Sequence, residues 1–65
     1  MKHFYVGQKW TARYGIFGMF FGEVIEVADE GECGVVFITD SCGNEIDIYS
    51  GSAAEFQSLG EWEPT

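Results

Sequence analysis

Basic residues are scarce in this chain of 65 residues, which has only three, Lys2, Lys9 and Arg13, against eleven acidic ones. All three lie in the first 13 positions, and the acidic residues begin at Glu23, so that the net charge is −8. A surface of this sign repels nucleic-acid phosphates and attracts cationic surfaces. The composition therefore favours a protein partner with a cationic surface over nucleic acid.

Groups that carry catalysis or bind metals are also scarce. The one histidine, His3, has no evident partner, and Ser41 and Cys42 have no histidine to activate them. Cys33 and Cys42 flank a predicted strand, which puts their Cα atoms about 25–30 Å apart at about 3.3 Å per residue, too far for a disulfide. We expect two free thiols, no metal site, no cofactor and no enzymatic activity.

Long apolar runs are absent, since none approaches the ~20 residues that span a bilayer. The first five residues, Met-Lys-His-Phe-Tyr, lack the apolar stretch of a signal peptide. We therefore expect a cytoplasmic product, complete from its own Met1, with no membrane partner. The length allows one domain over residues 1–65.

Aromatic residues and glycine, in contrast, are abundant: six Phe, three Tyr, two Trp and nine Gly. Large rings bury on the order of 150–250 Å² each, which suits a chain with little interior. Glycines punctuate β-branched and aromatic runs every few residues, a pattern typical of short strands joined by tight turns. The strands are predicted at residues 8–14, 19–27, 34–39 and 45–49.

Three details of these strands bear on function. Val24 and Val27 are three apart in the second strand, which predicts a bulge or bend. The fourth strand is predicted to turn Ile46 and Ile48 inward, leaving Glu45 and Asp47 on an exposed face with no cleft. Ser52-Ala-Ala-Glu55 is a capping-box pattern that predicts one or two helical turns ending at Gly60. Trp62 is expected to begin a short last strand or to plug one end.

These elements predict an all-β fold, a small four- to five-stranded barrel, closed or half-closed, with one short helical turn near the C-terminus. The segment Val6-Gly7-Gln8-Lys9-Trp10-Thr11-Ala12-Arg13-Tyr14 resembles the opening of a Tudor-like domain. The similarity continues through Gly22 to Val27, Val35-Val36-Phe37 and Gly43-Asn44-Glu45, over about residues 6–50. The outline is shared by SH3-like barrels in general.

The resemblance implies an aromatic cage that holds a methylated lysine or arginine by cation–π contact. Carried across, the cage positions fall on Tyr14, Phe20 and Phe37, with Asn44 as the polar residue that closes the site. A free-standing domain of this size is more typical of a bacterial or phage product. Core packing is the competing interpretation of the same rings.

Our first hypothesis is a non-enzymatic binding module that docks on a cationic surface or an Arg- or Lys-bearing segment of a protein. The glycine-spaced aromatic segment 14–21 would anchor it, through Tyr14, Phe17, Phe20 and Phe21. Acidic side chains would steer it, namely Asp29, Glu30, Glu32 and Asp40.

Two alternatives stay open, and homo-oligomerisation is compatible with all three. The chain could be a small phage-type inhibitor whose rows of carboxylates, at Glu23, Glu26, Glu45 and Asp47, imitate nucleic-acid charge. It could also bind nucleic acid directly through a basic and aromatic face formed by Lys9, Trp10 and Arg13.

Overall fold

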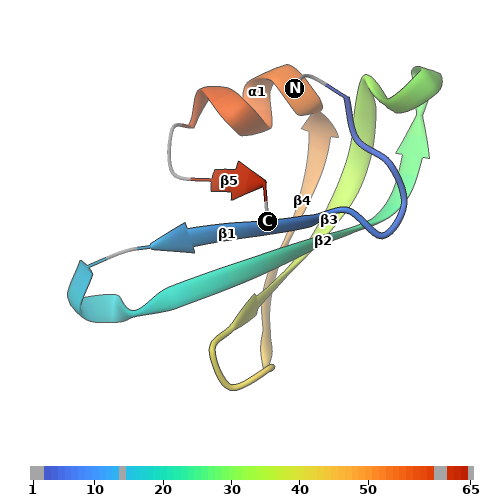
Figure 1. Cartoon of the computed structure of the whole chain (residues 1–65). Helices are drawn as coiled ribbons and strands as arrows, with labels where there is room; N and C mark the ends of the chain where they lie inside the picture. The colour runs from blue at the N-terminus through green and yellow to red at the C-terminus, as the bar shows by residue number, and fades with distance from the viewer. Residues whose placement is uncertain (1–2, 14, 60–61, 65) are drawn as a thin grey trace.

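The computed structural model describes residues 3–13, 15–59 and 62–64, although the side chain of Phe17 lies outside the described part. The described residues form five strands, one α-helix and two 3-10 turns (Figure 1). In chain order these are β1 (Lys9–Arg13), η1 (Gly15–Phe17), β2 (Met19–Ala28), η2 (Asp29–Gly31), β3 (Cys33–Asp40), β4 (Glu45–Ser52), α1 (Ala53–Ser58) and β5 (Trp62–Pro64). The helix is the short one expected from its capping pattern, since Ser52 Oγ accepts a hydrogen bond from the Glu55 N–H at 3.0 Å.

All strand pairs are antiparallel, and the order across the sheet is β4-β3-β2-β1-β5. The predicted bend in β2 is confirmed as a register shift against β3 between Val24 and Glu26. The third predicted strand is confirmed as an internal one, because β3 pairs with both β2 and β4. The fold is thus all-β, as the sequence predicts.

The sheet is not closed, so of the two forms expected, a closed or a half-closed barrel, the closed one is wrong. Its order ends in β4 on one side and β5 on the other, and β5 has only three residues. The helix α1 contacts both of these edge strands, and Figure 1 shows it crossing above the strongly twisted sheet. β4 is the last strand on its side of the sheet, so its edge away from β3 has no strand partner among the described residues.

The core lies on the face of the sheet that α1 covers. Alternate residues of the strands point to this inner face, beginning with Trp10 and Ala12 on β1. The full set of buried apolar residues is Phe4, Trp10, Ala12, Val24, Val36, Ala53, Phe56 and Trp62. Phe56 packs among the rings of Phe4, Trp10, Tyr49 and Trp62. Trp62 begins β5, which confirms the first of the two expectations for it, and its side chain belongs to the buried core.

Cys33 and Cys42 are both free thiols, as predicted. They lie at opposite ends of the strand β3 and the turn that follows it. Within the described residues, no helix is long and apolar enough to cross a membrane, and α1 itself has six residues.

Candidate functional site, an aromatic hollow beside the free edge of strand β4

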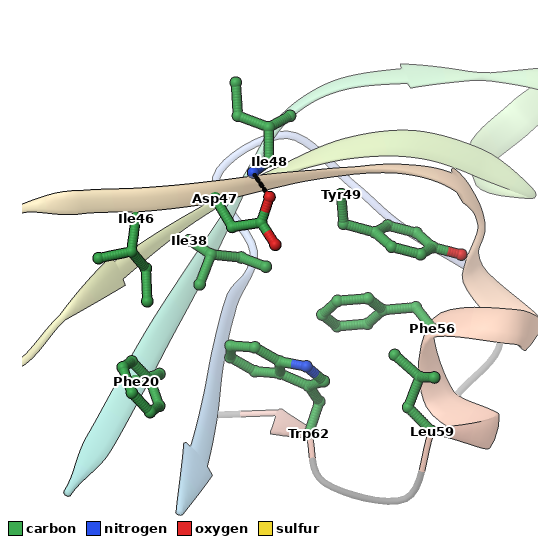
Figure 2. Close-up of a pocket in the computed structure, with 9 residues that line it drawn as sticks. All are labelled: Phe20, Ile38, Ile46, Asp47, Ile48, Tyr49, Phe56, Leu59 and Trp62. Atoms are coloured by element: carbon green, nitrogen blue, oxygen red, sulfur yellow. Dashed lines mark hydrogen bonds between the residues drawn. The ribbon is translucent and has the colours of Figure 1, made fainter. Parts of the chain in front are cut away.

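A hollow of about 370 Å³ opens on the inner face between β4, α1 and β5 (Figure 2). Its lining is mostly aromatic and aliphatic, with one carboxylate: Phe20, Ile38, Ile46, Asp47, Ile48, Tyr49, Phe56, Leu59 and Trp62. Ligand sites in proteins are typically apolar concavities of about 300–1,000 Å³ with a few placed polar groups. The hollow falls at the small end of this range, and we take it as the candidate site.

The pairing of β4 with β3 decides which of its side chains reach the hollow. Tyr49 pairs with the buried Val36, and Asp47 pairs with Ile38, so both share the inner face. Figure 2 shows Ile48 on the opposite side of the strand from Asp47 and Tyr49. Asp47 is exposed, as predicted, but it lines the hollow, so the expectation that no cleft lies beside it is wrong.

The prediction failed because β4 does not alternate regularly: Ile46 lies on the hollow side, as predicted, but Asp47 and Tyr49 lie on that side too, and Ile48 points away from it. The large ring of Tyr49 packs inward and so sets which residues of β4 face the core. Nearer the start of β4, its pairing with β3 shifts register between Ile38 and Thr39. Ile46 and Ile48 are left 50% and 48% exposed. Since Ile48 points away from Tyr49 and still borders the hollow, the hollow extends to the free edge of β4.

Three rings line one wall of the hollow, and Tyr49 is the most accessible of them, since Phe56 is fully buried and Trp62 is 8% exposed. The Phe56 ring lies 4.9 Å from that of Tyr49 and 5.2 Å from that of Trp62, stacked on the latter with an angle of 25°. The Tyr49 hydroxyl donates to the Ser52 carbonyl at 2.8 Å. Burial, with a smaller contribution from Glu55, raises the pKa of Tyr49, so this phenol stays neutral and the wall carries no charge of its own.

Asp47 is the one charged residue in the lining. Its Oδ1 accepts a hydrogen bond from the backbone N–H of Ile48 at 2.8 Å, at the exposed edge of the strand. No cation competes for it from the lining. Of the described basic residues, Lys9 is paired with Glu23 at 3.0 Å, and it shares the outer face of β1 with Arg13.

This arrangement suits a positively charged side chain. Faces of aromatic rings attract cations, by about 0.5–2 kcal/mol depending on desolvation. A carboxylate adds a charge-assisted hydrogen bond, and the aliphatic stem of lysine or arginine packs on apolar surface while its charged end reaches a partner. Ile38 and Leu59 provide such a surface.

The structure does not bring the predicted aromatic anchors onto one surface. Phe20 pairs with the buried Ala12 and lines the hollow, whereas Phe21 is 39% exposed on the outer face. Phe37 is half-buried and also faces outward, since it pairs with Glu23. Phe20 and Phe37 therefore cannot share the cage that the resemblance implies. Tyr14 and the side chain of Phe17 lie outside the described part of the chain.

Asn44, the fourth cage position, lies in the turn between β3 and β4, where its N–H donates to Asp40 Oδ1 at 3.0 Å. Asp40 thus stabilises this turn. Asp29, Glu30 and Glu32 are exposed at η2, at the other end of β3. Because that strand is about 25 Å long at about 3.3 Å per residue, the four predicted acidic residues form two separate groups.

The basic and aromatic face expected from Lys9, Trp10 and Arg13 is not assembled either. Trp10 is 1% exposed and points into the core, on the opposite face of β1 from the two basic residues. Among the residues that the structure describes, no three His, Cys, Asp or Glu side chains are grouped so that they could hold a metal ion.

Sequence reasoning missed most of the hollow, namely Asp47, Tyr49, Phe56, Leu59 and Trp62. A signal for part of it was present, because the capping pattern at Ser52 predicts a helix that carries Phe56 and Leu59 on one side. Nothing local indicates that this helix packs beside β4.

Comparisons of the chain with protein-family models, with curated proteins and with solved structures gave no match. The Tudor-like and SH3-like resemblance accordingly stays a prediction, and the site is argued from its own geometry.

Proposed function

We propose that the chain is a binding module that docks on a cationic protein segment by taking one lysine or arginine side chain into the hollow. The supporting observation is the combination in one concavity of three packed rings, at Tyr49, Phe56 and Trp62, with a single carboxylate at Asp47. The net charge of −8 steers a cationic segment toward the domain. The module works without chemistry of its own.

The test is titration of the protein with a short flexible peptide in which lysines are separated by glycine and serine. Tryptophan fluorescence reports the encounter, because Trp62 lines the hollow. Affinity is expected to fall as salt is raised, since screening acts within about 8–10 Å at physiological ionic strength. A peptide with glutamine in place of every lysine is expected not to bind.

A pair of variants separates the contribution of the hollow to affinity from that of the net charge. Asp47→Asn removes the carboxylate that lines the hollow, and we expect about tenfold weaker binding, from the loss of a hydrogen bond to a charged group. Asp29→Asn changes the net charge equally at η2, outside this hollow, and is expected to leave affinity within about twofold. Equal losses in the two variants would show that the hollow is not the site.

A further inference from the structure

The free edge of β4 borders the hollow, and this position bears on the form of the segment that binds there. The inference drawn from it rests on the proposed function. The strand runs over eight residues and has β3 on one side only. Its residues Glu45 to Ile48 are all exposed. An edge of this kind presents unpaired backbone groups to which an extended chain can add as a further strand.

The opposite edge of the sheet offers no comparable surface. The strand β5 has three residues and includes Pro64, which has no backbone N–H to donate. The helix α1 contacts both β5 and β4, the two edge strands of the sheet. Of the two edges that the described residues form, β4 is therefore the one suited to pairing.

We propose that the partner segment binds in extended form along β4, as a sixth strand that alternates cationic and apolar residues. Side chains of a strand alternate between the two faces of a sheet. Those on the inner face would meet the carboxylate of Asp47 beside the hollow. Those on the outer face would lie beside Ile48, which is 48% exposed.

The hydrogen bond between Asp47 and Ile48 couples the two parts of this recognition. In the free protein, Asp47 Oδ1 accepts from the Ile48 N–H at 2.8 Å and so occupies a donor on the exposed edge. A carbonyl group of an added strand would replace Oδ1 as the acceptor. The carboxylate is then released to pair with the cation, so that backbone pairing and charge recognition occur together.

A second copy of the chain is a poorer occupant of the same edge. Pairing β4 with β4 would bring Glu45 and Asp47 of each copy close to the same residues of the other. Like charges on adjacent strands are destabilising, and each copy carries a net charge of −8. Charge complementarity therefore selects a cationic strand.

The probe is a capped eight-residue peptide that alternates lysine and valine. Two analogues are compared with it: one is N-methylated at every valine amide, and the other at every lysine amide. In either strand direction only one of the two sets of amides faces β4. One analogue is therefore expected to bind at least about tenfold more weakly than the other, because it loses several backbone hydrogen bonds. All three peptides have the same charge.

Amide hydrogen exchange in the complex gives an independent readout. Since the Ile48 N–H bonds to Asp47 at the edge, Ile48 and Ser50 share the parity that faces away from β3. Their amides are expected to exchange at least about tenfold more slowly with the parent peptide bound. The Tyr49 amide, which has the opposite parity, is expected to change by less than about twofold and serves as the internal control.

Equal affinity of the two methylated analogues, or unchanged exchange at Ile48 and Ser50, would overturn strand addition. If the flexible lysine peptide still binds through Asp47, the proposed function survives that result. If no cationic peptide binds, both proposals fail.

Discussion

The ring of Phe56 stacks on the indole of Trp62, with ring centroids 5.2 Å apart and planes 25° from parallel. Phe56 belongs to α1 and Trp62 to β5, so the pair joins the helix to one edge of the sheet. The same Phe56 ring lies 5.3 Å from Trp10 of β1 and 4.9 Å from Tyr49 of β4. One side chain thus holds together three strands and the helix that fills the gap in the open sheet.

Replacing this ring is expected to be severely destabilising. Phe56 is fully buried, and truncation of a buried phenylalanine costs about 3–5 kcal/mol. Because a small domain has a total stability near the low end of about 5–15 kcal/mol, Phe56→Ala should leave a large unfolded fraction in urea titrations followed by circular dichroism. Leu59→Ala is the control, since Leu59 is mostly exposed. A similar loss in both variants would contradict the central role of Phe56.

Gly22 lies in the middle of β2, where a Cβ atom would come within 2.9 Å of Val36 Cγ1 and 3.5 Å of the Trp62 ring. Val36 is fully buried and cannot move aside easily. Gly22→Ala is therefore expected to lower the free energy of unfolding by about 1–3 kcal/mol through overpacking.

A double-mutant cycle identifies the cause. Val36→Ala removes the Cγ1 atom that the new methyl group would meet, so adding Gly22→Ala to it should cost little beyond the Val36→Ala change alone. Additive losses would show that the two positions do not clash.

The contrast between these core positions and the hollow explains what the sequence could predict. Strand positions, the bulge after Val24 and the cap at Ser52 follow from local alternation, glycine spacing and capping chemistry, and they are confirmed. The inward phase of β4 depends instead on how Tyr49 packs against Phe56, which comes from a later element. Asp47 entered the site through this non-local contact. Phe20 and Phe21, in contrast, lie on opposite faces because they are adjacent in β2, which local alternation alone predicts.

Gly31 and Gly43 have similar backbone angles but differ in how closely other atoms of the protein approach them. Both have left-handed backbone angles, with φ of 92° and 87°. A Cβ atom at Gly31 would meet the backbone carbonyl of Phe4, whereas at Gly43 nothing lies within 4 Å. The Phe4 N–H also donates to the Gly31 carbonyl at 2.7 Å, so the N-terminal segment cannot shift without losing this bond.

Both alanine variants carry the cost of the left-handed backbone, about 1–2 kcal/mol. Only Gly31→Ala adds a clash with the segment that brings Phe4 into the core, so we expect its melting temperature to fall further, by the equivalent of about 1–3 kcal/mol. Thermal unfolding followed by circular dichroism measures this. Equal melting temperatures would mean that the contact with Phe4 does not restrict position 31.

The turn between β3 and β4 should make the protein sensitive to acid. Asp40 Oδ1 accepts from the Asn44 N–H at 3.0 Å and the Cys42 N–H at 2.8 Å. These bonds, with that from Asn44 the larger cause, lower the pKa of Asp40 below its ordinary value of 3.8. A carboxyl group with a lower pKa in the folded state stabilises the fold above its unfolded pKa, and this contribution is lost as the pH falls through the folded pKa.

Asp40→Asn keeps an oxygen acceptor but has no charge to lose. The parent chain is expected to be the more stable of the two at about pH 7, and the gap should close as the pH falls below about 4. Urea midpoints of both proteins across this range measure the gap, and the other carboxyl groups cancel in the difference. A gap that is constant with pH would count against the role of the Asp40 charge.

Charge at the free edge of β4 is expected to keep the chain from pairing with itself. Glu45→Gln combined with Asp47→Asn removes both carboxylates from the exposed start of this edge strand. Since each like-charged pair of neighbours on adjacent strands costs about 0.2–1 kcal/mol, self-association should strengthen by up to about tenfold. Sedimentation measures this against Asp29→Asn combined with Glu30→Gln, which changes the net charge equally at η2. If the η2 variant self-associates as strongly, net charge rather than its placement on the edge governs association. If only the β4 variant does so, the same carboxylates that exclude a second copy are in position to select a cationic strand.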